Sequence, residues 1–317
     1  MQRSRFLRLL STGGTLWPEA AQFGWAEPEV LRPADAPKVL LVVAHPDDES
    51  ECAAVIYRVT RELRGVVDQA IVTNGEAGYH WSGPAETVYG LDLANEKTAR
   101  RHLPRIRRKE VLRANEILGV RDTYFFDQQD TGFTFDPREG LRAWNSERVR
   151  AALIRLIDRE QYDLILTLLP GEDTHGHHQS VAILVLQAVA ELPREQRPAV
   201  LGVRTSSEED ASVEFVERSG FPLTRTTSAE PVWSFDRKTT ISNSPLDYSI
   251  VVHWVIAEHK SQGMFQMEFG RRRYEQFWLF EMSGNAGRAK WEGFLGKFHS
   301  TARTEYAAKE VRRHAYA

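Results

Sequence analysis

Hydrophobic runs alternate with helical periodicity along the first two thirds of the chain. Residues 39–44 form a continuous apolar run, which is typical of a parallel strand buried on both faces. After the polar turn at 45–49, apolar residues recur at the spacing of one helix face: Cys52, Val55, Ile56, Val59 and Leu63. Residues 66–73 are typical of a second strand, so this region predicts a right-handed strand–helix–strand unit.

The same alternation continues beyond a polar segment at 79–103, which is too long for a bare connection. It predicts a helix at 107–118, a strand at 122–126, a helix at 147–159, a strand at 163–169 and a helix across 181–188. Alternating strands and helices indicate an α/β fold, with a Rossmann-like, doubly wound, mainly parallel sheet and helices on both faces.

Most of the chain belongs to one predicted domain. We expect an N-terminal tail at 1–37 and a single α/β domain at 38–317. The domain comprises a core at 38–190, an insertion at about 205–230, and a C-terminal extension with a helix at 247–261 and a strand at 275–282.

Composition excludes several classes of protein. The 41 basic and 44 acidic residues give a net charge of −3, which excludes the broad basic surface of a nucleic-acid-binding protein. A single cysteine, Cys52, excludes a disulfide scaffold and a cysteine-rich zinc site. No apolar run approaches the roughly 18 residues that an integral membrane segment requires.

The N-terminus carries a weak export signal. Arg3, Arg5 and Arg8 resemble the basic start of a signal peptide, but polar residues interrupt the apolar stretch that should follow. We therefore expect a cytoplasmic protein, with an exported form and a cleaved segment within residues 1–37 as the alternative.

Two polar clusters follow predicted strands, at 45–49 and at 173–178. Ligands of open α/β sheets bind beyond the carboxyl ends of the strands, so the clusters can meet in one site. A catalytic zinc takes three nitrogen or oxygen ligands from the protein. His45, Asp48 and a histidine of the second cluster supply such a set, and the metal would lower the pKa of its water toward roughly 7.

Asp47 is left beside the ligand Asp48, and a free carboxylate there is a candidate general base. The alternative is helix capping by the aspartates, which would not explain His45 or the histidines of the other cluster. In that cluster, His175 and His178 are three residues apart and can share a helix face, whereas His177 points about a quarter-turn or more away. His178 is the economical choice of ligand, with His175 as a second functional group.

The segment Ala-His-Pro-Asp-Asp-Glu at 44–49, followed by His-x-x-His at 175–178, resembles the PIG-L/LmbE-like family of metal-dependent N-acetylglucosamine-type deacetylases. The resemblance covers about 38–190, with weaker similarity to about 282. It implies that His45, Asp48 and His178 bind the metal and that Asp47 is the general base. It also implies that His175 stabilises the charged intermediate or protonates the leaving amine.

Weaker similarities concern the substrate. The resemblance implies that Arg107, in Arg-Arg-Lys-Glu at 107–110, and Asp130, in Asp-Thr-Gly-Phe at 130–133, contact the substrate. An exposed helix charge and a turn residue are the respective alternatives. Residues 257–262 also resemble a family segment, but an ordinary exposed helix end is the simpler interpretation.

One position departs from the family pattern, because His177 stands where the family often has aspartate. That aspartate can orient a neighbouring histidine. Here Asp173 or Glu172 takes that role, or the histidine itself carries charge.

The favoured function is metal-dependent hydrolysis of the N-acyl, chiefly N-acetyl, amide of an amino sugar or its conjugate. We expect a hydrolytic enzyme with one divalent metal ion, Zn²⁺ in the first place with Fe²⁺ as the alternative, and a small-molecule substrate. The alternatives are a metal-dependent hydrolase of another amide or ester, and a non-catalytic carbohydrate- or nucleotide-binding protein. The first turn lacks the glycines of a dinucleotide site, and the sequence leaves the oligomeric state open.

Overall fold

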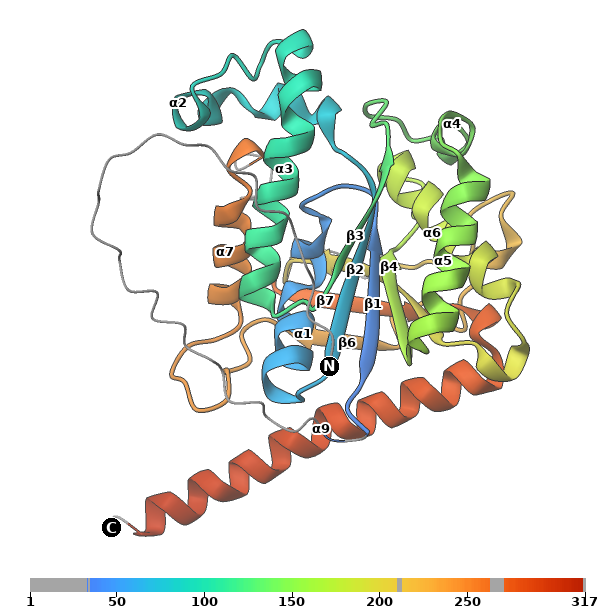
Figure 1. Ribbon diagram of the computed structural model, residues 1–317. Coiled ribbons are helices and arrows are strands. Elements are labelled where there is room, and N and C mark those ends of the chain that lie inside the picture. Colours follow the sequence, from blue (N-terminus) through green and yellow to red (C-terminus); the bar gives the residue numbers. More distant parts are fainter. Residues whose placement is uncertain (1–32, 34, 210–212, 263–270, 316–317) are drawn as a thin grey trace, which may run out of the picture. The chain divides into compact units, whose positions relative to one another are not determined.

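A mostly parallel sheet of seven strands organises the computed structural model, which describes residues 33, 35–209, 213–262 and 271–315 (Figure 1). The strands are β1 (Lys38–Val43), β2 (Val66–Thr73), β3 (Thr123–Gln128), β4 (Leu164–Leu168), β5 (Ala199–Ser206), β6 (Trp233–Asp236) and β7 (Tyr274–Leu279). Their order is β3-β2-β1-β4-β5-β7-β6; β7 runs antiparallel to both of its neighbours, β5 and β6, and the other pairs are parallel. The predicted fold class is confirmed.

Helices cover both faces of the sheet, as Figure 1 shows. The α-helices are α1 (Ala53–Tyr57), α2 (Glu86–Tyr89), α3 (Glu96–Leu118), α4 (Pro137–Ala143), α5 (Ser146–Glu160), α6 (Gly176–Ala190), α7 (Ser249–Glu258) and α9 (Gly284–Ala315). Successive residues of β1 point to opposite faces of the sheet and pack against different helices. Leu41 packs in the cluster with α1, α3, α7 and α9, whereas Leu40 packs in the cluster with α5 and α6.

The segment 79–103 is more ordered than the sequence pattern predicts. Helix α3 begins at Glu96 rather than at 107, because the Asn95 side chain caps it by accepting a hydrogen bond from the Thr98 amide at 3.1 Å. The helix continues through Pro104. Because proline usually ends or kinks a helix, the sequence pattern did not predict the three turns before residue 107. Strands β5 and β6 were not predicted, and the late strand begins at Tyr274.

Residues 1–32 lie outside the described residues, so the division of the chain at residue 37 stays a prediction. Among the residues that the structure describes, none of the helices combines the length and the hydropathy needed to cross a bilayer.

A buried ion pair connects the antiparallel edge of the sheet to the start of α1. The side chains of Glu275 and Arg237 are fully buried and lie 3.0 Å apart. Glu275 also accepts hydrogen bonds from the amides of Ala54 and Val55, both at 3.0 Å, while Arg237 donates to the Ser50 carbonyl. The pair therefore holds the chain directly after the 45–49 motif.

Glu275→Gln should lower the free energy of unfolding by about 3–5 kcal/mol, because it leaves a buried arginine facing an uncharged amide. Urea denaturation measures this change. Glu217→Gln is the matched control, since its pair with the exposed Arg225 is worth about 1 kcal/mol or less. Equal losses in the two variants would contradict the assignment.

Candidate active site

The two polar clusters meet at the carboxyl ends of neighbouring parallel strands. Residues 45–49 follow β1, and residues 169–175 lead from β4 into α6. β1 and β4 pair in parallel and are buried apart from Lys38, so the first polar residues after each strand are brought to the same edge of the sheet. The expected meeting of the clusters is therefore present in the structure.

The side chains of His45, Asp48 and His178 form a compact triangle at this edge. His45 Nδ1 lies 3.3 Å from His178 Nε2, His178 Nε2 lies 3.1 Å from Asp48 Oδ1, and His45 Nδ1 lies 3.6 Å from Asp48 Oδ2. Tetrahedral zinc bonds of about 2.0–2.1 Å place neighbouring ligand atoms about 3.3–3.4 Å apart. The spacing and chemistry of this donor set therefore fit one divalent metal ion.

Asp48 is held as an anion in this triangle. Its Oδ2 accepts hydrogen bonds from the amides of Ala44 and His45 at 3.0 and 2.8 Å. Burial disfavours the charged carboxylate, but His178 and His45 outweigh burial and hold the pKa of Asp48 well below its usual value. The carboxylate thus supplies the negative charge that a divalent cation requires.

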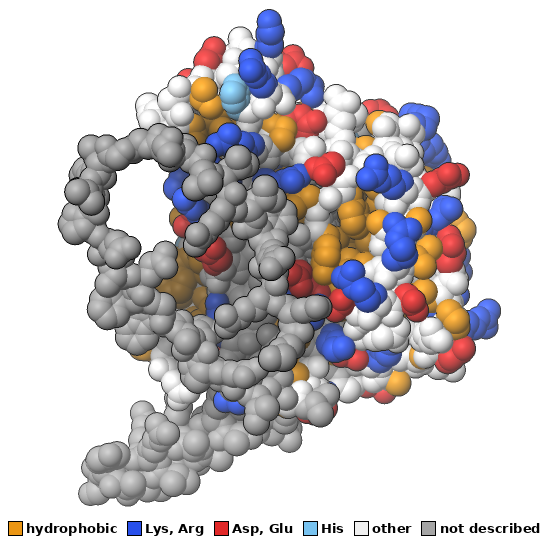
Figure 2. All heavy atoms as spheres, in the orientation of Figure 1, with side chains coloured by type: hydrophobic (Ala, Val, Ile, Leu, Met, Phe, Trp, Pro, Cys, Tyr) orange, Lys and Arg blue, Asp and Glu red, His pale blue; other side chains and the backbone are white. Residues whose placement is uncertain are grey.

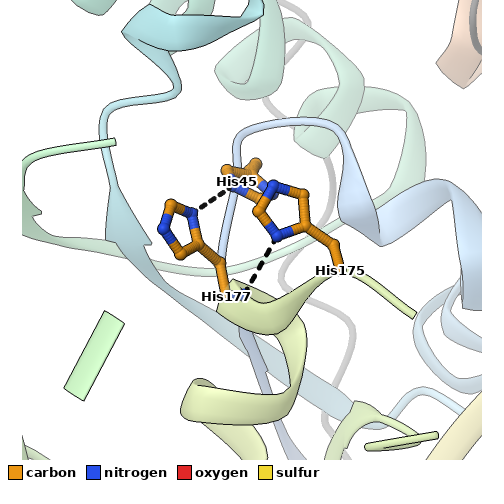
Figure 3. Close-up of side chains that lie close together, drawn as sticks. All are labelled: His45, His175 and His177. Carbon is orange, nitrogen blue, oxygen red and sulfur yellow. Dashed lines mark hydrogen bonds between the residues drawn. The ribbon is translucent and has the colours of Figure 1, made fainter. Parts of the chain in front are cut away.

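A second set, comprising His45, His175 and His177, also gathers nitrogen atoms within metal-binding range (Figure 3). His177 contacts His45 Nε2 through Nδ1 at 3.2 Å and Thr131 Oγ1 through Nε2 at 2.9 Å. His175 Nδ1 accepts from the His177 amide at 3.0 Å. Because this set has no carboxylate to balance the charge of a divalent cation, the set with Asp48 is the better metal site.

The start of α6 explains how its histidines are placed. His175 is the N-cap residue, and its imidazole replaces the usual oxygen acceptor. His177 and His178 therefore lie in the first turn and point in different directions. Gly176, directly after the N-cap residue, has to be glycine because a Cβ there would lie 2.8 Å from the Asp136 carbonyl oxygen.

Asp47, beside the triangle, is paired with an arginine through one of its two carboxylate oxygens. Arg107 is only 2% exposed, and its Nη2 lies 2.9 Å from Asp47 Oδ1. The same guanidinium donates to the carbonyl oxygens of Gly75 and Pro46. Burial raises the pKa of Asp47, and Arg107 opposes that shift. Substrate contact by Arg107 stays a prediction, and its guanidinium is already engaged with Asp47.

Asp130 also lies beside the site histidines. It is 4% exposed and accepts hydrogen bonds from the amides of Gly132 and Ala77 at 2.9 and 3.2 Å. Its Oδ1 lies 3.5 Å from His177 Nδ1. Burial opposes ionisation, but His45 and His177 lower the pKa of Asp130. Its predicted contact with substrate is likewise untested.

His177 itself occupies the orienting position beside His45. Asp173 and Glu172 are paired instead with Arg204 and Arg218, and their side chains are 65% and 68% exposed. The expectation that one of these carboxylates would orient a site histidine is therefore wrong. The buried His177 lies against His45 Nε2, packed under the Trp144 ring at 5.0 Å.

Thr131→Val should weaken metal binding by about 10–100-fold, the usual effect of losing a partner behind a metal ligand. With Nδ1 of His45 facing the metal, its Nε2 carries the proton and donates to His177, which in turn donates to Thr131. Competition with a chelator measures the affinity. Thr87→Val, which removes a hydroxyl that donates to the Pro84 carbonyl away from the histidines, is the matched control. Equal affinities in both variants would contradict this relay.

The sequence pattern missed a buried polar layer beneath Asp47. His259 and Glu49 are both fully buried and form an ion pair, while Glu110 accepts from the Ser261 amide and hydroxyl at 2.9 and 2.6 Å. Burial disfavours the charged imidazole, but Glu49 raises the pKa of His259. The interpretation of 257–262 as an exposed helix end was wrong, and only the family resemblance carried a signal for it.

Two exposed aromatic side chains lie beside the histidines. Phe133 and Phe135 are 70% and 53% exposed, with ring centroids 4.9 Å apart. The Phe133 ring also lies 4.9 Å from the His175 ring. Their exposure could not be predicted from the sequence, because an exposed phenylalanine cannot be told from a buried one by its spacing.

Comparison with known proteins adds a family match over the same region. A model described as "PIG-L: GlcNAc-PI de-N-acetylase" matches residues 40–189. The chain is 26% identical over 175 residues to a probable N-acetyl-alpha-D-glucosaminyl L-malate deacetylase 2 of Bacillus anthracis. The matched segment covers 55% of this chain and 69% of that protein. The chain is 28% identical over 163 residues to the protein of the same name from Bacillus subtilis, covering 51% of this chain and 65% of that protein.

Among solved structures, the chain is similar to an N,N'-diacetylchitobiose deacetylase from Pyrococcus horikoshii. The TM-score is 0.49 at 17% identity, and the match covers 78% of this chain and 85% of that one.

Proposed function

Since residues 40–189 belong to the PIG-L family, as their motifs predicted, we propose that this chain is a metal-dependent deacetylase. It hydrolyses the N-acyl, chiefly N-acetyl, amide of an amino sugar or its conjugate. The observation that carries this proposal is the triangle of His45, Asp48 and His178 with the carboxylate of Asp47 beside it.

The triangle would hold one Zn²⁺ ion, because two imidazoles and one carboxylate suit zinc in a three-ligand catalytic site. Fe²⁺ fits the same donor set, and metal availability decides between the two. When bound, such a metal supplies a positive charge that polarises the substrate carbonyl and lowers the pKa of a coordinated water toward about 7.

Asp47 would act as the general base. Arg107 binds its Oδ1, while Oδ2 has no hydrogen-bond partner among the described residues and is available to accept a proton from the attacking water. Burial raises the pKa of Asp47, which brings the carboxylate closer to the working range of a base near neutral pH. Arg107 thereby orients the base and keeps it ionised.

His175 would stabilise the oxygen that becomes negative during attack. Its Nδ1 accepts from the His177 amide, so in the neutral imidazole the proton is on Nε2. Burial and the neighbouring imidazoles lower the pKa of His175 far below its usual value, which keeps the ring neutral. A neutral N–H donor favours hydrogen bonding to the developing oxyanion over delivery of a proton to the leaving amine.

The surroundings suit a sugar. The exposed rings of Phe133 and Phe135 offer an apolar surface beside His175 on which the substrate can pack. The curated relatives bear the name of a deacetylase of an N-acetylglucosaminyl conjugate, which supports the amino-sugar class for this chain.

A primary-amine release screen tests the proposal. Metal-free protein is assayed with N-acetylglucosamine, its glycosides and its conjugates, with and without added Zn²⁺ or Fe²⁺. Amine release from at least one amino-sugar substrate, dependent on the metal, is the expected result. Release from non-sugar amides or esters alone would contradict the proposed substrate class.

A further inference from the structure

A cavity of about 360 Å³ lies between α3 and the segment that follows α2. Apolar and aromatic side chains of Tyr89, Leu91 and Ile106 form part of its lining. Arg107, on the same helix, is turned to Asp47 and does not line this cavity. The cavity is therefore formed by a different stripe of α3 from the one that serves the candidate active site.

Basic residues border this cavity at regular spacing. Arg105, Lys109 and Arg113 all line it and are exposed. Residues four apart on a helix lie on one face and rise by about 6 Å, so these three charges form one row. None of the three has an ion-pair partner within the described parts of the chain. Figure 2 shows Lys and Arg side chains beside hydrophobic ones at this end of the molecule, over α2 and α3.

The carboxylate in the lining, that of Glu110, is already engaged in hydrogen bonds. Glu110 is 3% exposed and accepts from the Tyr89 hydroxyl at 2.6 Å and from the Ser261 amide and hydroxyl at 2.9 and 2.6 Å. It therefore does not reach out to the basic row. These bonds also fix the Tyr89 ring, so the wall of the cavity is formed before any ligand arrives.

We propose that this cavity is a second binding site, which takes a small organic phosphate with an apolar or aromatic part. The apolar part lies against Tyr89, Leu91 and Ile106, and the phosphate contacts the basic row. A guanidinium group can donate two parallel hydrogen bonds to two oxygens of one phosphate. The cavity volume is in the range of small-molecule sites. The site is separate from the proposed deacetylase centre and does not depend on it.

Phenyl phosphate is a suitable probe, because it combines an aromatic ring with a phosphate group. Binding is followed by calorimetry and by the ³¹P resonance of the probe. We expect saturable binding that weakens as salt is added, with weaker binding of inorganic phosphate and none of benzyl alcohol. Absence of phenyl phosphate binding, or equal binding of benzyl alcohol, would overturn the proposal.

Variants assign the binding to this cavity. Arg105→Gln/Lys109→Gln/Arg113→Gln should weaken it at least tenfold, and Lys109→Gln alone should weaken it less. Arg155→Gln is the matched control, since Arg155 is exposed on α5 and does not line the cavity. His45→Ala should keep the binding. If His45→Ala abolishes it and the triple variant retains it, the probe occupies the candidate metal centre and the second site is refuted.

Discussion

His45→Ala and His178→Ala should each lose the bound metal and, with it, nearly all deacetylase activity. Each imidazole is one of three side chains whose ligand atoms lie 3.1–3.6 Å apart, and the remaining two side chains do not form a site of comparable affinity. We expect metal binding to fall by more than about 100-fold, beyond the usual effect of losing an outer partner. Metal analysis after dialysis against a weak chelator measures the content.

His253→Ala is the matched control, because this histidine is exposed on α7 and is absent from both candidate metal sets. It should retain about one metal per chain, as the unchanged protein does. Unchanged metal content in both His45→Ala and His178→Ala would refute the ligand assignment. Loss in His45→Ala and His177→Ala, with retention in His178→Ala, would move the metal to the set of three histidines.

Asp47→Asn should keep the metal and lose about 10²–10⁴-fold in kcat, the range typical of a general base. Asparagine preserves the shape of the side chain and can still accept a hydrogen bond from Arg107, so the fold around the 45–49 motif is maintained. It cannot take a proton from water. Metal content and turnover are measured on the same preparation.

Asp48→Asn is the comparison that separates base from ligand. It removes the negative charge between His45 and His178, so it should lose metal as well as activity. If Asp47→Asn loses the metal while Asp48→Asn keeps it, the two aspartates have exchanged roles.

The central strands could be predicted because burial on both faces leaves a continuous apolar run. β1 and β2 were recognised in this way, and the predicted bounds of β2 match the observed Val66–Thr73. Strand β5 carries Gly202 and Arg204 within Ala199–Ser206, which breaks such a run. β6 has only four residues, so it is too short to show a period.

The grouping of the candidate site residues was predictable where it follows from residue type and position after a strand. His45, Asp48 and His178 needed only the rule that neighbouring strands end at the same edge. The partners of Arg107 and His259 could not be predicted in this way. Both side chains are buried against residues more than 50 positions away, and a charged helix residue has the same pattern whether it faces solvent or Asp47.

Titration of activity with metal is the most direct test of the central claim, that one metal held by this chain drives deacetylation. Metal-free protein receives increasing Zn²⁺ or Fe²⁺, and free amine and acetate are measured together from a responsive N-acetyl amino sugar. The two products should appear in equal amounts, and activity should rise to a plateau at one metal per chain. Full activity in the metal-free protein, or amine release without equal acetate from that substrate, would contradict the claim.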